Sequence, residues 1–147
     1  MMKSVNIFKL MVKNHRKIEN LLTKLEENNN KDFESMQNAF NKFEWELEKH
    51  IFTEEKAIFT TYNPEDKAEG YKMLPELTKQ HNFILNKLNN WRKDIKNKRM
   101  ISDIYSFKIY LIRHKTYEEE KVYTMLDQSL TENEKKHIES KINEIVQ

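Results

Sequence analysis

The sequence lacks cysteine altogether and is poor in residues that break helices, with one glycine and two prolines among 147 residues. Without cysteine there can be no disulfide, no thiolate zinc site, no cysteine-ligated iron–sulfur cluster and no cysteine nucleophile. The single glycine, Gly70, also excludes a phosphate-cradling loop or a dinucleotide-binding fingerprint, because each of these needs several glycines. These absences remove several large classes of enzyme and binding site.

Long hydrophobic runs are missing as well. No segment reaches the roughly 18 apolar residues of a membrane span, and the N-terminal stretch MMKSVNIFKLMVKNH has no apolar core long enough for a signal peptide. The 26 basic and 24 acidic residues are interspersed, as on a solvated helical surface and unlike the basic stripe of a nucleic-acid-binding protein. We therefore expect a cytoplasmic protein without nucleic-acid or membrane partners, and the length predicts one domain over residues 1–147.

Four polar or helix-breaking stretches divide the chain, at residues 26–32, 60–76, 97–103 and 129–134. Between them apolar residues recur at steps of three and four, which places each set on one face of a helix. The first set contains Phe8, Met11, Ile18, Leu22 and Leu25, and the fourth contains Ile104, Phe107, Leu111, Val122 and Met125. The pattern predicts an all-α fold, an up-down-up-down four-helix bundle with a short additional C-terminal helix. Thr131 and Glu134 would begin that last helix as a capping box.

One histidine interrupts each of the four apolar stripes: His15, His50, His81 and His114. The only acids on the stripes are Glu54 and Glu118, each one helical turn after the histidine of its own helix. Almost the same interval separates the first and third histidines as the second and fourth. This repeat predicts a pseudo-twofold arrangement, with the four imidazoles at similar depth and the two carboxylates facing each other. The fifth histidine, His137, lies off the stripe and is predicted to be a surface residue.

Two interpretations of these six residues are open. A lone histidine on an apolar face is more often a satisfied core residue than a ligand, and protonated histidines could neutralise the glutamates as buried ion pairs. Such pairs give no stability over leucine, whereas a metal cluster satisfies neutral imidazoles and ionised carboxylates together. Four imidazoles and two carboxylates are too many for one zinc ion, and calcium or magnesium prefers oxygen ligands throughout. The set therefore favours two first-row metal ions, with iron as the leading choice and manganese possible.

The motifs around these residues resemble one protein family. KNHRKIENLL in the first helix, HIFTEE in the second, KQHNFIL in the third and HKTYEEEKVY in the fourth are similar to the hemerythrin-like HHE cation-binding domain, over nearly the whole chain. The resemblance implies two iron ions joined by an oxo or hydroxo bridge. It also implies that His15 and His50 hold one iron, that His81 and His114 hold the other, and that Glu54 and Glu118 bridge the two.

Two positions depart from the pattern of the oxygen-carrying hemerythrins. Their fifth histidine would fall at Leu85, four residues after His81, and their fourth-helix acid lies five residues after its histidine, where this chain has Glu119. We assign Glu118 because it lies on the stripe, whereas Glu119 is rotated by about 100° around the helix. Without the fifth histidine, both irons would keep an open position unless a tyrosine, Glu119 or water fills it.

An open di-iron centre in an apolar bundle predicts a protein that binds or responds to dioxygen, nitric oxide or peroxide. The resemblance also suggests reversible oxygen carriage or storage, and iron-centre repair, as alternatives. An activity of the peroxidase or oxidase type would make the chain an enzyme, and a metal-free helical interaction module is the alternative from a different class. The sequence does not predict a partner protein.

Overall fold

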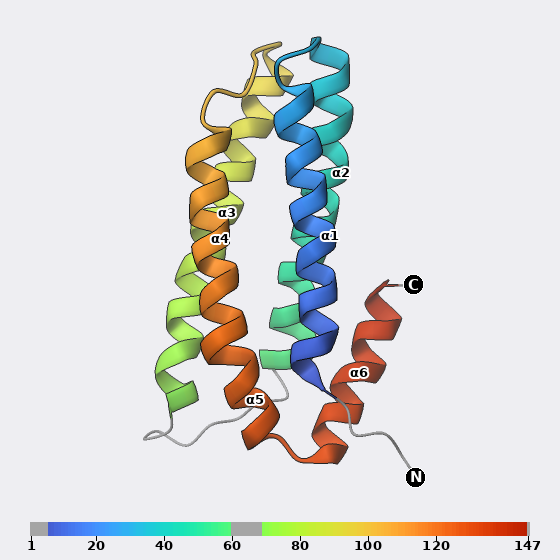
Figure 1. Cartoon of the computed structure of the whole chain (residues 1–147), viewed down its shortest axis with the longest axis vertical. Coiled ribbons are helices and arrows are strands. Elements are labelled where there is room, and N and C mark those ends of the chain that lie inside the picture. Colours follow the sequence, from blue (N-terminus) through green and yellow to red (C-terminus); the bar gives the residue numbers. More distant parts are fainter. Residues whose placement is uncertain (1–5, 60–68, 147) are drawn as a thin grey trace.

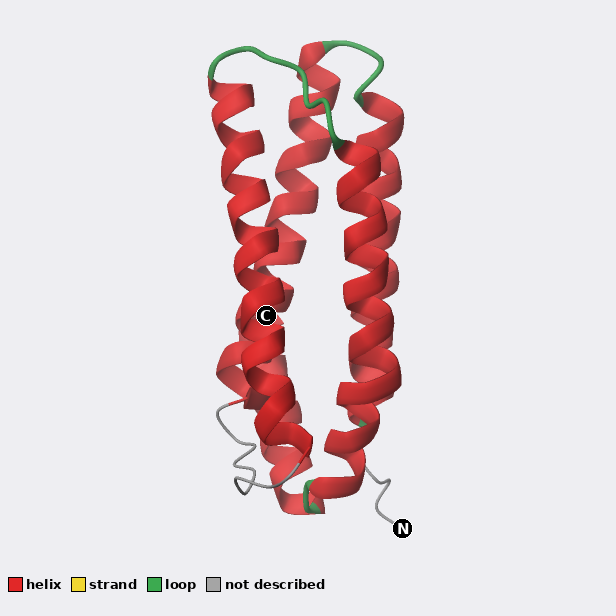
Figure 2. Cartoon of the chain, turned by 90° about the vertical axis from the view of Figure 1, so that its left-hand side faces the viewer, coloured by secondary structure: helices red, strands yellow, loops and turns green. Residues whose placement is uncertain are grey.

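The computed structural model describes residues 6–59 and 69–146, and almost all of this part is helical. Four long helices run antiparallel, side by side: α1 (Ile7–Asn28), α2 (Phe33–Thr53), α3 (Glu69–Lys96) and α4 (Ile104–Tyr117) (Figure 1). The described residues contain no strand (Figure 2). The predicted all-α, up-down-up-down bundle is therefore confirmed.

The second and fourth helices of the bundle do not end where regular α-helix ends. α2 continues into a π-helical segment, η1 (Glu54–Phe59), and α4 continues through a second one, η2 (Glu118–Val122), into α5 (Tyr123–Ser129). A π-helix bonds residue i to residue i+5, so each such segment accommodates one extra residue per turn and shifts the phase of the residues after it. Met125, which regular helical spacing places inside, is consequently only half-buried, and Leu126 and Leu130 are buried instead.

The C-terminal helix α6 (Glu132–Val146) packs outside the bundle, against α2 and η1 (Figure 1). Its predicted capping box is confirmed: the Thr131 amide donates to Glu134 Oε1 (2.9 Å), and the Glu134 amide donates to Thr131 Oγ1 (3.1 Å). Ile138 is buried and His137 is exposed, as predicted. None of the described helices is both long enough and apolar enough to cross a lipid bilayer.

The start of α1 corrects one expectation about its buried face. Ile7 is fully buried, whereas Phe8 is 37% exposed. The carboxylate of Asp127 accepts hydrogen bonds from the amides of Ile7 (2.8 Å) and Phe8 (3.1 Å), and the side chain of Asn6 caps the helix by accepting from the Lys9 amide (3.0 Å). These bonds fix the first turn with Ile7 inward, because residue 7 precedes Met11 by one turn.

The stretch 60–76 is only partly a helix break. Residues 60–68 lie outside the described part, but α3 begins at Glu69, so Gly70 and Pro75 are inside a helix. Pro75 is on the exposed side of α3, while Met73 and Leu77 on either side of it are buried. Burial of these apolar neighbours outweighs the low helix propensity of proline here, as tertiary packing commonly does.

The apolar core is split into two parts along the bundle, named here from the orientation of Figure 1. The upper cluster comprises Ile18, Leu22, Leu25, Met36, Phe40, Phe43, Leu47, Ile51, Ile84, Leu88, Trp91, Ile95, Ile101, Ile104, Phe107 and Leu111. The lower cluster comprises Ile7, Met11, Ile58, Met73, Leu77, Val122, Tyr123, Leu126, Leu130 and Ile138. In α1 the division falls between Met11 and Ile18, at His15. A polar layer therefore separates the two clusters.

Replacing Leu88 with alanine should lower the free energy of unfolding by about 2–5 kcal/mol, because this fully buried side chain would leave a cavity in the upper cluster. Ile109→Ala, on the exposed side of α4, is the control and should change stability by less than about 0.5 kcal/mol. Urea unfolding followed by circular dichroism measures both. Equal losses in the two variants would contradict the assignment of the core.

Candidate metal centre

Six buried ionisable side chains form the layer between the two clusters. Each helix of the bundle supplies one histidine: His15 from α1, His50 from α2, His81 from α3 and His114 from α4. Glu54 and Glu118 are the first residues of η1 and η2. His81 and both glutamates are fully buried, and the other three histidines keep only 3–6% of their surface. The structure thus brings together all six residues that the sequence singled out.

The Nε2 atoms of the imidazoles turn toward the two carboxylates. Glu118 Oε1 lies 3.1 Å from Nε2 of both His15 and His114, and Glu118 Oε2 lies 3.9 Å from His81 Nε2. Glu54 Oε1 lies 2.6 Å from His50 Nε2 and 3.8 Å from His81 Nε2. Each carboxylate therefore contacts histidines from both the first and the second pair of helices.

Two overlapping sets of these donors have the size of a metal site. In each set one ligand atom from every residue lies within 4.8 Å of the others, and the sets are His15, His50, Glu54 and Glu118, and Glu54, His81, His114 and Glu118. Both carboxylates belong to both sets. The division of the histidines into two pairs is the one expected from the sequence.

Two amide side chains outside the layer hold the histidines of α2 and α4. His50 Nδ1 donates to Asn14 Oδ1 (2.5 Å), and His114 Nδ1 donates to Gln80 Oε1 (2.6 Å). Each amide belongs to the residue just before a histidine of the layer, on the neighbouring helix of its pair. This contact turns Nε2 of each ring inward, and a neutral imidazole with its proton on Nδ1 offers the Nε2 lone pair that a metal requires.

Two carboxylates outside the layer face the Nδ1 atoms of the histidines of α3 and α1. His81 Nδ1 donates to Glu55 Oε1 (3.2 Å), and His15 Nδ1 faces Glu119 Oε2 at 3.6 Å. Each of these acids directly follows a glutamate of the layer. The four outer oxygens thus repeat the pseudo-twofold pattern. The sequence pattern did not identify Asn14, Gln80 and Glu55 as acceptors for Nδ1, although the motifs N/Q-H and H-x-x-x-E-E contain the signal.

Glu118 occupies the inner position of the fourth helix, and Glu119 does not. The side chain of Glu118 is fully buried, whereas that of Glu119 is 19% exposed and approaches only the outer nitrogen of His15. Helical phase favours the same choice. The regular α-helix of α4 extends through Tyr117, so the step of four from His114 to Glu118 spans one helical turn.

Each π-helical segment places one aromatic ring against the layer. Tyr123, five residues after Glu118, places its hydroxyl 3.1 Å from His15 Nε2. Phe59, five residues after Glu54, stacks on His81 with ring centroids 6.1 Å apart. The two positions correspond, but only the first carries a hydroxyl. Tyr123 is therefore a polar group of the site that regular helical spacing could not reveal, because the i+5 position faces inward only in a π-helix.

Burial governs the proton balance of the two carboxylates. Burial raises the pKa of Glu54 well above 4.5, and the charge of Glu118 raises it further. Burial also raises the pKa of Glu118, but the neighbouring Glu54 carboxyl group and the interactions with His114 and His15 outweigh it and hold that pKa well below 4.5. Without a metal ion the two carboxyl groups therefore hold one proton between them, and Glu54 has the higher pKa.

Burial also determines the states of two neighbouring groups. It lowers the pKa of His81 below 6.5, which leaves this imidazole neutral and available as a ligand. It raises the pKa of Tyr123 well above 10.0, an effect to which the charges of Glu118 and Glu54 add, so the phenol keeps its proton in the metal-free protein.

Several buried atoms of the layer lack hydrogen-bond partners among the described residues, and a metal ion fits them. Neither oxygen of Glu54 has a hydrogen bond of normal geometry, despite its close contact with His50, and Glu118 Oε2 and His81 Nε2 also lack one. In another buried acid, Glu46, Oε1 is paired with Lys17 (3.0 Å) and Lys49 (3.2 Å), and only Oε2 lacks a partner, whereas both oxygens of Glu54 lack one. Unpaired buried polar atoms are costly, so the donors of the layer suit a cation that binds nitrogen and oxygen together.

Comparison with known proteins gives one match. A family model described as the hemerythrin HHE cation-binding domain matches residues 6–143, which is nearly the whole chain and includes every residue of the layer. No curated protein and no solved structure matches the chain significantly.

Replacing Glu54 with glutamine should stabilise the metal-free protein as pH rises. The pKa of Glu54 is raised in the folded state, so this group contributes stability that is present below its ordinary pKa and lost as pH rises through the folded-state pKa. Glutamine does not titrate and avoids this loss. The stability difference should therefore be small below about pH 4.5 and larger at about pH 8. Urea unfolding of chelator-treated protein measures it.

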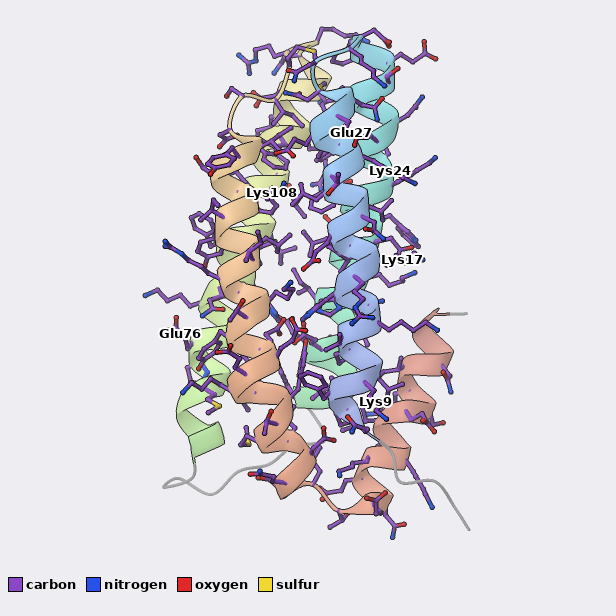
Figure 3. The ribbon with its side chains drawn as sticks, viewed as in Figure 1. Lys9, Lys17, Lys24, Glu27, Glu76 and Lys108 are labelled. Carbon is purple, nitrogen blue, oxygen red and sulfur yellow. The ribbon has the colours of Figure 1, made fainter. Side chains whose placement is uncertain are left out.

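Glu27→Gln, at an exposed position of α1 (Figure 3), is the matched control and should give no gain that depends on pH. If the stability difference between Glu54→Gln and the wild type does not increase from about pH 4.5 to about pH 8, the raised pKa of Glu54 is refuted.

Asn14→Leu should weaken metal binding by about tenfold to a hundredfold while the fold persists, because His50 would lose the acceptor that orients its ring. Asn90→Leu replaces an exposed asparagine of α3 and should leave metal affinity unchanged. Competition with a chromophoric chelator measures both affinities. Equal affinities in the two variants would show that the amide of Asn14 does not support the site.

Proposed function

Because the chain belongs to the hemerythrin family of HHE cation-binding domains, we propose that it holds two iron ions in the buried layer and binds or responds to dioxygen, nitric oxide or peroxide. One ion would bind His15 and His50, the other would bind His81 and His114, and both would bind Glu54 and Glu118. Manganese accepts the same donors, and elemental analysis separates the two metals.

The overlap of the two candidate sets carries this proposal. One metal ion would leave two of the four histidines without a ligand role, whereas two ions that share both carboxylates use all six donors. Mixed imidazole and carboxylate ligands are typical of iron and its first-row neighbours. The Nδ1 acceptors add support, because metal-bound histidines usually donate their other ring N–H to a carbonyl or carboxylate oxygen.

Bound iron would supply a Lewis-acidic, redox-active centre for a diatomic molecule or peroxide. The chain supplies the surroundings. The upper and lower clusters cover the layer with apolar side chains from both sides, which limits access of water. The Tyr123 hydroxyl, 3.1 Å from His15 Nε2, offers an oxygen ligand or a proton donor on the side of the first histidine pair. Phe59 offers neither on the side of the second pair.

The position of Leu85 favours a responsive centre over a reversible oxygen carrier. Oxygen carriers of the family have a histidine there, and in this chain a leucine packs against the upper cluster instead. With four histidines in place of five, the ions would have fewer protein ligands and more positions for water or substrate. Such a centre should react with dioxygen or peroxide and not store it.

Protein expressed with ample iron should contain close to two irons per chain. Glu118→Gln should lose most of this iron, because both ions would share that carboxylate. Glu119→Gln is the adjacent control and should retain it, because glutamine keeps an oxygen near His15 Nδ1 outside the layer. Elemental analysis measures the content. Stoichiometric zinc, the absence of metal, or loss of iron only from the Glu119 variant would refute the assignment.

The same preparation tests the response to ligand. The reduced protein, mixed with oxygenated buffer in a stopped-flow instrument, should oxidise without an oxygenated form that an argon purge reverses. A stable adduct that the purge removes would identify an oxygen carrier and contradict the proposal.

A further inference from the structure

An apolar cavity of about 200 Å³ lies beside the layer, between α1, α2 and α4. Its walls are formed by Ile18, Leu22, Leu47 and Leu111, all members of the upper cluster. Within the described part of α3, no residue lines it. The cavity therefore reaches the layer from one side of the bundle only.

The cavity ends on the histidines. His15, His50 and His114 line it, whereas His81 does not. The exposure of these residues agrees with this geometry, because the three lining histidines keep 3–6% of their surface and His81 keeps none. A molecule in the cavity would thus touch donors of both proposed metal positions, since His15 and His50 belong to one and His114 to the other.

The mouth of the cavity lies between α1 and α4, at the exposed residues Thr23 and Ile112. Two ion pairs join these helices there, and three of their side chains, Glu19, Lys108 and Lys115, line the cavity. Glu19 pairs with Lys115, and Glu26 pairs with Lys108 at 3.1 Å; Lys108 is labelled in Figure 3. In each pair the two charges neutralise one another. These four charges therefore do not select an ion over a neutral molecule at the mouth.

We infer that this cavity is a binding pocket for a small, uncharged, apolar molecule up to about the size of benzene. Enclosed apolar cavities of about 150 Å³ bind benzene or xenon, and this one, which opens to solvent between α1 and α4, has a volume of about 200 Å³. It has more room than a diatomic ligand needs, so an apolar organic molecule can lie directly beside the histidines. The pocket itself is formed by side chains of this chain. Only the presence of iron beside the bound molecule rests on the proposed function.

Xenon and benzene test the pocket in the iron-loaded protein. Crystals pressurised with xenon should show an anomalous peak among Leu22, Leu47 and Leu111. In solution benzene should raise the melting temperature and approach saturation, because a ligand that binds only the folded state stabilises it. Ordered water in place of xenon, together with no response to benzene, would overturn the inference.

Two variants separate binding in the cavity from binding elsewhere. Leu111→Phe adds a ring to the cavity and should weaken benzene binding at least about tenfold. Ile112→Trp enlarges a residue at the mouth that is 41% exposed, so it should fold normally and slow the exchange of bound benzene in saturation-transfer NMR. Ile109→Trp, on the same helix but outside the cavity, should change neither affinity nor exchange. If all three variants behave like the wild type, benzene binds at another place and the inference is wrong.

Iron content tests the proposed function, and benzene binding tests the pocket, so the two hypotheses can be refuted separately. Iron-loaded protein that does not take up benzene or xenon would refute the pocket and leave the proposed function intact. Protein that binds benzene but holds no iron would refute the proposed function and leave the pocket intact.

Discussion

The removal of six ionisable side chains from water is the constraint on which the rest of the structure depends. Four imidazoles and two carboxylates form one layer across the bundle, and apolar clusters lie on both sides of it. A carboxyl group in such a place must be protonated, paired with a cation or held by hydrogen-bond donors. In the metal-free chain the pKa of Glu54 is raised and that of Glu118 is lowered, so one carboxyl group favours the protonated form and the other the ionised form. Two shared cations would meet the same demand with every donor in use.

The backbone adapts to this layer at the two glutamates. Both π-helical segments begin at a glutamate of the layer, and α2 and α4 are regular α-helices up to those points. π-helical turns are frequent at functional sites, and the extra residue re-aims the side chains beyond it. Here they turn Phe59 and Tyr123 toward His81 and His15. The same change of phase carries Leu126 and Leu130 into the lower cluster.

The two halves of the layer are nearly equivalent, and their differences have consequences. Each half contributes an amide and a carboxylate that face outer imidazole nitrogens, so the ligand geometry repeats. The phenol of Tyr123 lies against His15, whereas the phenyl ring of Phe59 occupies the corresponding position against His81. The cavity adds a second asymmetry, since it reaches three histidines from the side of α1 and α4 and leaves His81 fully buried. Two metal ions held here would therefore have unequal surroundings.

Sequence alone determined the helical class, the order of the bundle helices and the six residues of the layer. These follow from local rules: apolar spacing of three and four defines a buried face, and a histidine or glutamate on that face must lie inside the bundle. Local rules failed where the period itself changed. The spacing places Met125 inside and does not indicate Tyr123 as a residue of the site. Both errors have one cause, because the sequence spacing does not predict the switch from i+4 to i+5 bonding at Glu118.

The helical continuation of α3 through Pro75 was likewise decided by burial of Met73 and Leu77, which depends on other helices. The pairing of Asn14 with His50, the raised pKa of Glu54 and the cavity beside the layer all arise from contacts between different helices. Periodicity within one helix predicts which side faces inward. Only the packed bundle decides what each inward group meets there.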